Sequence, residues 1–202
     1  MKSRIAITTC RNPTRGIRSL ANDLAAAIPN AYRVTRGKQS LGDLSEAFYT
    51  SKADRAIFVQ RWMGGPGKIE LKTMVGQELN TLPPVIHLAG VRFKREYGES
   101  RRVKAEAITI EPNVATELLE FAEKLAEFLG LPILRNRGNI PCNASLHISK
   151  HPSHKAKLAL TKPPGIREVG PSLVVKDLVW EKVSCEEGNS RIIRGIPIQG
   201  SC

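Results

Sequence analysis

The spacing of hydrophobic positions changes several times along the chain, and each change marks a predicted element. Apolar and β-branched residues fill a short run near the start, and apolar positions then recur at helical spacing. The first part of the chain predicts strands at residues 4–9, 31–35 and 55–60 and helices at residues 17–28 and 41–48, the second of them capped by Ser40. Because parallel neighbours need a crossover connection, this β-α-β-α-β order predicts parallel strands with helices packed on them.

The rest of the chain mixes strands and helices in similar proportion. Residues 62–67 form a glycine-rich turn, and the alternation over residues 68–74 is typical of an antiparallel edge strand. Further strands are predicted at residues 85–89, 107–110, 131–134, 157–161 and 172–180, and a helix opens at Pro112-Asn113 and ends at Gly130. The predicted fold class is α/β. The pattern is consistent with a duplicated α/β unit, although the two halves share no visible repeat.

Composition changes the picture by setting outer limits. The chain has 202 residues, of which 41% are hydrophobic and 25% charged, and its formal net charge is +12 with a pI of about 9.9. This length allows one domain of two lobes or two small domains. No apolar run approaches the roughly 20 residues of a membrane span, and the N-terminal run is shorter than the roughly 7 to 15 residues of a signal-peptide core. We therefore expect a soluble, cytoplasmic protein with no membrane partner.

The four cysteines are scattered along the chain. Cys10, Cys142, Cys185 and Cys202 contain no C-x-x-C pair and match no structural zinc spacing. We expect reduced thiols, which are usual in the cytoplasm. A disulfide between Cys185 and Cys202 stays an open alternative.

Positive charge is concentrated in the first forty residues, where Asp23 is the only acid. The first strand–helix junction carries Arg11, Arg15 and Arg18, the second carries Arg33, Arg36 and Lys38, and Lys2 and Arg4 precede both. In a parallel arrangement both junctions lie at the same edge of the sheet, so six cations converge on one rim. Such a surface suits a polyanion, and RNA is the leading candidate.

A second basic segment follows in the middle of the chain. It contains Arg92, Lys94, Arg95, Arg101, Arg102 and Lys104, and it either extends the rim or forms a separate loop. Arginine predominates in the N-terminal rim, which suits bidentate phosphate contacts. Aromatic residues make up only 5% of the chain, so binding is expected to depend on backbone and shape more than on base stacking. The alternative is that the charge is dispersed and serves solubility.

Two kinds of catalytic site find little support in the sequence. Residues 64–68 read GGPGK, but a P-loop requires glycine where Trp62 stands and a hydroxyl residue where Ile69 stands, so a hairpin turn is the better interpretation. For nucleophilic catalysis, His87 lies in a strand-like run and no G-x-S-x-G elbow exists. We expect no catalytic residue and no cofactor.

A metal site is the remaining chemical possibility. Cys142, His147, His151 and His154 are all potential zinc ligands, and His147 and His151 share a face if residues 146–151 are extended. Lysines interleaved with these residues would repel a cation. We therefore expect a basic loop with neutral or phosphate-facing histidines, and no metal.

Three motifs in order then resemble the Brix domain family of ribosome-biogenesis proteins, most closely its short archaeal members. They are residues 7–15 (ITTCRNPTR), residues 33–38 (RVTRGK) and residues 168–171 (EVGP) with the strand that follows. The resemblance runs from about residue 4 to residue 183. It implies a Brix domain over residues 1–185, with a first lobe over about 1–82, a second over about 83–185, and a C-terminal tail over 186–202.

The resemblance also implies two pseudo-two-fold-related α/β lobes, each similar to the anticodon-binding domain of class II aminoacyl-tRNA synthetases. Carried over by position, Thr9, Arg11, Pro13 and Arg15 form the first RNA-facing turn, Arg36 and Gly37 the second, and Gly170-Pro171 the matching turn of the second lobe. Ser172 stands where family members often have a basic residue.

The resulting hypothesis is a non-enzymatic, monomeric factor that binds rRNA or pre-rRNA and works with ribosomal assembly proteins. Its predicted RNA-binding residues are Thr9, Arg11, Arg15, Arg18, Arg33, Arg36, Gly37, Lys38, Arg92, Lys94 and Arg95. Two alternatives stay open: an RNA- or tRNA-handling enzyme with an unrecognised site, and a protein-interaction module that uses the acidic face of the helix after Asn113 or the C-terminal tail.

Overall fold

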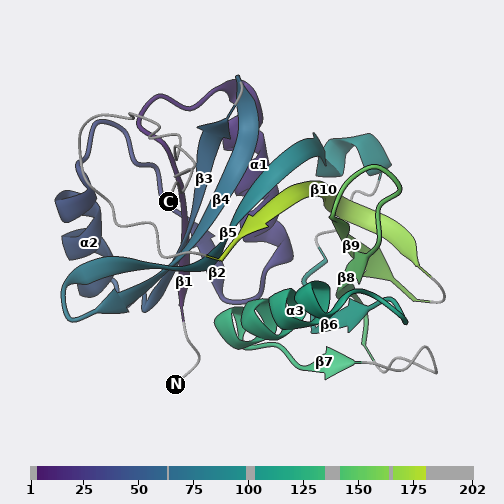
Figure 1. Cartoon of the computed structure of the whole chain (residues 1–202). Coiled ribbons are helices and arrows are strands. Elements are labelled where there is room, and N and C mark those ends of the chain that lie inside the picture. Colours follow the sequence, from purple (N-terminus) through teal and green to yellow (C-terminus); the bar gives the residue numbers. More distant parts are fainter. Residues whose placement is uncertain (1–3, 63, 99–102, 135–141, 164–165, 181–202) are drawn as a thin grey trace, which may run out of the picture.

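The computed structural model describes residues 4–62, 64–98, 103–134, 142–163 and 166–180, and its ten strands form one mixed sheet (Figure 1). The first half contains β1 (Ile5–Thr9), α1 (Arg15–Ala27), β2 (Ala31–Arg33), α2 (Leu41–Thr50), β3 (Arg55–Trp62), β4 (Gly65–Val75) and β5 (Glu78–Arg92). The second half contains the 3-10 helix η1 (Lys94–Tyr97), β6 (Ala107–Ile110), α3 (Thr116–Leu129), β7 (Ile133–Leu134), β8 (Ser145–Ser149), β9 (Ala156–Lys162) and β10 (Arg167–Val179). The α/β class is confirmed.

The order of strands across the sheet is β2-β1-β3-β4-β5-β10-β9-β8-β6-β7. β1 lies parallel between β2 and β3, β6 lies parallel between β7 and β8, and the remaining neighbours are antiparallel. The parallel arrangement predicted for the first three strands is therefore confirmed. Each strand of the second half takes the place of its counterpart in the first, and the two halves meet where β5 pairs with β10.

Alternate residues of β1 and β3 point into two different cores. Ile5 and Ile57 belong to a large core with α1 and α3, whereas Ala6 and Phe58 pack with Leu44 of α2. α1 and α2 therefore lie on opposite faces of the first half of the sheet. The large core contains apolar residues from both halves, so the halves are packed together as well as paired through β5 and β10.

Helix ends follow local capping chemistry. Thr14 caps α1 by accepting a hydrogen bond from the Ile17 amide at 3.4 Å. Ser40 and Asp43 form a capping box at the start of α2, so the predicted capping of this helix by Ser40 is confirmed. The helix predicted to open at Asn113 begins only at Thr116, because Asn113 has a left-handed φ of 59° that a helix cannot contain. No helix in the described ranges is long and apolar enough to cross a membrane.

Two strand predictions were wrong in their position or extent. β4 was expected at an edge, but it lies between β3 and β5 and its middle residues, from Ile69 to Lys72, are buried. β5 was expected over residues 85–89, but it runs without a break from Glu78 to Arg92 through Pro83-Pro84. The register of β5 against β4 shifts at these prolines, which is the kind of irregularity that accommodates a residue without an amide N–H.

Candidate nucleic-acid interface

The carboxyl ends of β1, β2 and β3 lie at one edge of the sheet, where the loops after β1 and β2 diverge. The loop after β1 leads to α1 on one face, and the loop after β2 leads to α2 on the other. Divergent loops leave a crevice at such a switch point. Here the crevice is a concavity of about 560 Å³, which we call the arginine concavity. Its lining residues are Thr9, Arg11, Asn12, Pro13, Arg18, Asn22, Arg33, Thr35, Arg36 and Gly37.

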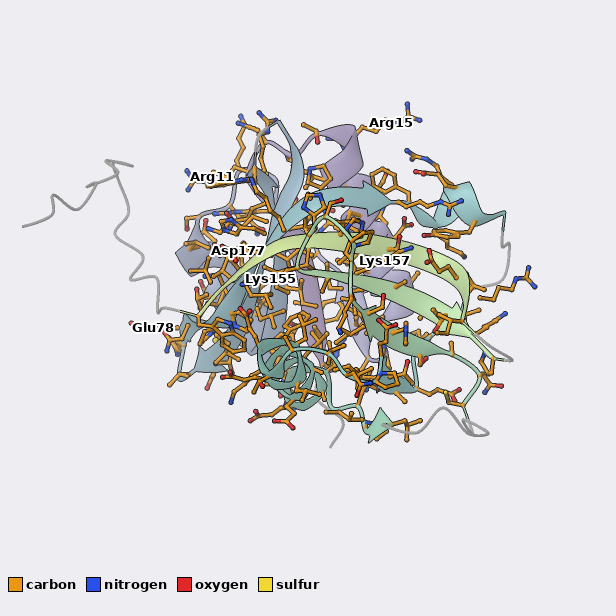
Figure 2. All side chains as sticks on the ribbon, turned by 45° about the vertical axis from the view of Figure 1, so that its right-hand side comes forward. Arg11, Arg15, Glu78, Lys155, Lys157 and Asp177 are labelled. Carbon is orange, nitrogen blue, oxygen red and sulfur yellow. The ribbon has the colours of Figure 1, made fainter. Side chains whose placement is uncertain are left out.

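Most of the rim residues predicted from the first forty positions are gathered at this site. Thr9, Arg11, Arg18, Arg33, Arg36 and Gly37 all line the concavity. Arg15 and Lys38 are not among the lining residues, and both are exposed next to it in the chain. Figure 2 shows Arg11 and Arg15 toward the same end of the molecule, away from Glu78. The fold therefore collects arginines that are up to 25 residues apart, from Arg11 to Arg36, on one margin.

Several guanidinium groups hold the loops that form the concavity. Arg33 donates to the Ile7 carbonyl at 3.0 Å and also to the Val34 carbonyl, and Arg18 donates to the Pro13 carbonyl at 3.1 Å. A guanidinium group has five N–H donors, so these contacts leave donors of Arg18 and Arg33 for a ligand. The same side chains can thus order the site and bind an anion.

The electrostatic setting of the concavity is positive. Within the described part of the chain, Arg11, Arg18 and Arg33 form no ion pair with a carboxylate. Burial lowers the pKa of Arg33 from its usual value, but an arginine remains charged at neutral pH. Asp43 caps the start of α2 through hydrogen bonds with Ser40. These hydrogen bonds and, to a lesser extent, the charge of Arg11 lower the pKa of Asp43.

Three contributors to the site were not predicted from the sequence. Arg61, near the end of β3, donates to the Asn12 carbonyl at 3.2 Å and so holds the loop that leads into α1. Parallel strands end at the same edge of a sheet, and this rule predicted the residues after β1 and β2. It also applies to Arg61, because β3 is parallel to β1. Asn22 and Thr35 were missed as well, since their side chains carry no charge to single them out.

The second basic segment lies along another side of α1. The Lys94 amide donates to Asp23 at 2.9 Å, and Arg95 donates to Ser19 at 3.4 Å. Arg92 stacks over the Tyr97 ring with its Cζ 4.2 Å from the ring centroid. Ser19 and Asp23 are not among the residues that line the concavity, so this segment flanks the site across α1. Arg101 and Arg102 lie outside the described residues.

Comparison with known proteins connects this geometry to a family. No family model matches the chain. A probable Brix domain-containing ribosomal biogenesis protein of Methanopyrus kandleri is 29% identical over 185 residues, which cover 85% of this chain and 93% of the relative. The protein of the same name from Pyrococcus furiosus is 27% identical over 192 residues, which cover 87% of this chain and 84% of the relative.

Solved structures agree in fold with the chain. The crystal structure of a probable ribosomal biogenesis protein from Aeropyrum pernix has a TM-score of 0.70 at 27% identity, covering 87% of this chain and 96% of that one. The chain belongs to the Brix domain family. The crystal structure of Mil, an archaeal Imp4-like protein, shares the fold of this Brix domain with a TM-score of 0.61 at 18% identity, covering 88% of this chain and 100% of that one.

Gly170 and Pro171, which the family resemblance assigned to an RNA-facing turn of the second half of the Brix domain, do not form a turn. Gly170 and Pro171 are buried inside β10, at a point where the register against β9 shifts. A Cβ atom on Gly170 would lie 2.6 Å from Cδ2 and 3.0 Å from Cβ of Leu160. The glycine therefore allows two strands to approach closely, and these two residues cannot form an RNA-facing turn.

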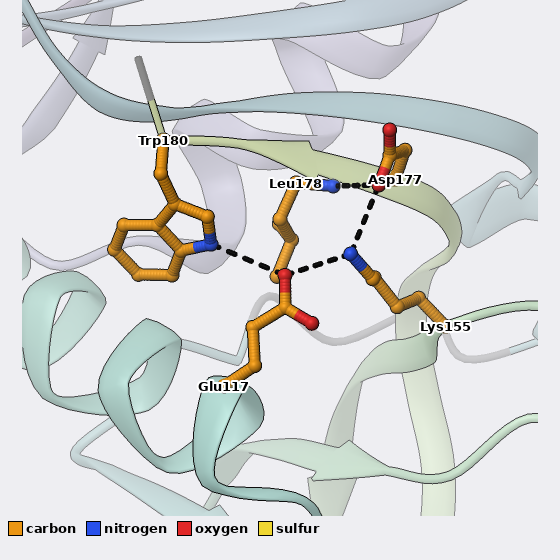
Figure 3. Close-up of polar contacts among 5 residues, drawn as sticks. All are labelled: Glu117, Lys155, Asp177, Leu178 and Trp180. Carbon is orange, nitrogen blue, oxygen red and sulfur yellow. Dashed lines mark hydrogen bonds and ion pairs between the residues drawn. The ribbon is translucent and has the colours of Figure 1, made fainter.

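The corresponding edge of the second half of the Brix domain carries its own ion pairs (Figure 3). Lys155 lies 2.7 Å from Glu117 at the start of α3 and 2.9 Å from Asp177 of β10, and the Trp180 indole donates to Glu117 at 3.2 Å. The Glu117 hydrogen bond is the main cause of a raised Lys155 pKa. In contrast to Arg11, Arg18 and Arg33, this lysine therefore has its positive charge balanced by carboxylates of the protein itself.

This ion-pair network predicts a pH dependence of stability. The hydrogen bond from Lys155 holds the pKa of Asp177 below its usual value of 3.8. A lowered folded-state pKa contributes stability that is present above the unfolded-state pKa and is lost as pH falls through the folded-state value. We expect the free energy of unfolding to fall between about pH 5 and pH 2, and Asp177→Asn to remove at most roughly 1 kcal/mol of that change.

Urea unfolding at several pH values measures this difference, and Glu120→Gln, at another exposed carboxyl group on α3, serves as the control. An Asp177→Asn variant with the same pH dependence as the unaltered protein would show that the pair does not contribute.

The GGPGK segment of the Brix domain begins the second strand of a hairpin and is not a phosphate-binding loop. β3 and β4 pair antiparallel on either side of the turn, and Lys68 lies within β4 with its ammonium 2.6 Å from Glu70. A P-loop needs a helix after its lysine, and here a strand continues.

The histidine segment of the Brix domain is only partly extended. β8 ends at Ser149, so His151 does not share a strand face with His147 as proposed from the sequence. His147 is buried with its Nδ1 atom 3.0 Å from the Thr109 hydroxyl, whereas the rings of His151 and His154 lie 5.1 Å apart. In the described ranges, no group of three His, Cys, Asp or Glu side chains is placed to hold a metal ion.

Proposed function

We propose that this Brix domain protein takes part in ribosome biogenesis by binding rRNA or pre-rRNA in the arginine concavity, without catalysing a reaction. The observation that carries the proposal is the convergence of Arg11 from the loop after β1, Arg18 from α1 and Arg33 from the end of β2, with no carboxylate paired to them among the described residues. The relatives named as ribosomal biogenesis proteins support it.

Arginine chemistry favours a phosphodiester backbone as the ligand. A planar guanidinium group binds phosphate oxygens with two parallel hydrogen bonds, and its charge does not depend on physiological pH. The concavity volume of about 560 Å³ lies within the range of about 300–1,000 Å³ that accommodates a nucleotide-sized group. The amino end of α1, capped by Thr14, adds favourable potential for an anion at the same edge.

The internal symmetry of the strand order supports a related proposal about architecture. The two halves are α/β lobes related by a pseudo-two-fold axis, each similar to the anticodon-binding domain of class II aminoacyl-tRNA synthetases. The first lobe covers about residues 1–82 and the second about residues 83–185, so that the boundary falls within β5 and the axis passes near the pairing of β5 with β10. The domain acts as a monomer, with ribosomal assembly proteins as further partners. The tail predicted over residues 186–202 lies outside the described residues.

Salt dependence of RNA binding tests the proposal directly. On single-stranded RNA the logarithm of the binding constant falls with the logarithm of salt by about 0.7 per phosphate contact, so contacts from Arg11, Arg18, Arg33 and Arg36 predict a slope of roughly −3. Fluorescence anisotropy with a labelled rRNA fragment measures this slope. Absence of binding, or binding that is insensitive to salt, contradicts the proposal. Cleavage or modification of the fragment by the pure protein would favour an enzyme.

A further inference from the structure

Trp62 lies at the end of β3, at the same sheet edge as the arginine concavity, and 43% of its surface is exposed. One side of the indole contacts the His87 ring, at a centroid distance of 4.7 Å and an interplanar angle of 46°. The indole lines a groove of about 460 Å³ together with Pro66, Phe93 and Lys176, which we call the indole groove. An exposed aromatic surface of this kind is available for stacking.

The hairpin after β3 is built around this indole. The register of β3 against β4 shifts between Gln60 and Arg61, and such a bulge changes the direction in which the following side chains point. A Cβ atom on Gly67 would lie 2.6 Å from the Trp62 Cβ and 2.8 Å from the Trp62 carbonyl oxygen. Only glycine therefore fits at position 67, where the backbone of β4 approaches Trp62 closely at the register shift.

The indole groove and the arginine concavity are linked by direct contacts. Arg61, which precedes Trp62, donates to the carbonyl of Asn12 in the lining of the concavity. Pro66, which lines the groove, lies next to Gly16 in the first turn of α1. A Cβ atom on Gly16 would be in van der Waals contact with the Pro66 ring, 3.5 Å away. The two sites thus share the loop and helix start that follow β1.

We infer that the combined surface binds single-stranded RNA, with one unpaired base stacked on Trp62 and the neighbouring phosphates in the arginine concavity. This inference rests on the proposed function. Cations beside an aromatic platform are the combination with which proteins bind single strands, because bases in a duplex are stacked on each other and cannot reach a side chain. Lys176 supplies positive charge in the indole groove, and Arg61 holds the Asn12 loop of the arginine concavity.

The ring that contacts the indole agrees with an uncharged base as a further stacking partner of Trp62. Burial, and then the charge of Lys68, lower the pKa of His87, so the imidazole next to Trp62 is neutral at pH 7 and presents an uncharged ring. Duplex RNA is expected to bind through its phosphates alone. Loss of base stacking typically reduces the affinity for a single strand roughly tenfold.

Tryptophan fluorescence tests the inference because the chain has only two tryptophans. In a Trp180→Phe protein, a single-stranded oligoribonucleotide is expected to quench the emission of Trp62, and a duplex of the same sequence is not. Trp62→Ala is expected to weaken single-strand binding roughly tenfold without changing duplex binding. Trp62→Phe should retain most of the affinity, and it keeps the test valid if the alanine variant folds poorly. Tyr49→Ala, at an exposed aromatic residue of α2, is the matched control.

The outcomes separate this inference from the proposed function. Salt-sensitive binding of single strand and duplex with equal affinity, unchanged in Trp62→Ala, overturns the inference and leaves the proposed function standing. Failure of both RNAs to bind overturns both. A single-strand preference that disappears in Trp62→Ala, and that an abasic oligonucleotide no longer shows, supports the stacked base.

Discussion

Replacement of Arg11, Arg18 and Arg36 by alanine is expected to weaken rRNA binding roughly 100-fold, since each lost charged contact to phosphate contributes about 1 kcal/mol or more. The salt slope should become about 2 units shallower at the same time. All three side chains line the concavity, and Arg11 and Arg18 are exposed, so we expect little change in the free energy of unfolding. Arg33 is left in place because it holds the Ile7 carbonyl.

A charge-matched variant shows whether position matters. Lys104→Ala, Lys124→Ala and Arg167→Ala together remove three positive charges from exposed positions that do not line the concavity. Anisotropy titrations of the two triple variants at equal ionic strength give the comparison. If both lose affinity to the same extent, binding reflects overall charge and the assignment of the concavity is wrong.

Loss of a buried charge in β4 is expected to have the largest effect on stability. The Glu70 carboxylate lies 2.6 Å from the Lys68 ammonium and 3.4 Å from the Lys72 ammonium, and Lys72 also donates to Thr81 at 2.7 Å. Lys72 is only 3% exposed. Glu70→Leu leaves this ammonium buried without its counter-charge, which is expected to lower the free energy of unfolding by about 3–5 kcal/mol. Denaturant unfolding followed by circular dichroism measures the loss.

The double variant Glu70→Leu, Lys72→Met separates the unpaired charge from packing. It removes both buried charges, and Lys68, whose side chain is 21% exposed, can turn to solvent. Replacement of a buried ion pair by apolar residues of similar size is often close to neutral, so most of the stability should return. A double variant as unstable as Glu70→Leu alone would show that the cost comes from packing and not from the unpaired charge.

The site was only partly predictable because sequence patterns specify the ends of strands better than the direction of side chains. Arg11 and Arg36 follow from the rule that parallel strands end at one edge. Trp62 was assigned to a turn, but it ends β3 and borders a groove whose other walls come mainly from β4 and β5. Arg95 was grouped with the rim because of its charge. The packing of η1 against α1 instead places Arg95 beside Ser19, outside the concavity.

The sequence by itself determined most of the local elements and the excess of arginine at the first two strand ends, because periodicity, caps and charge act between neighbours in the chain. Only the tertiary structure decided that β5 pairs with β10, that Gly170-Pro171 lies inside a strand, and that Lys155 is neutralised by Glu117 and Asp177. These depend on contacts between residues far apart in the chain, whose partners are chosen by packing of the whole sheet and not by any local pattern.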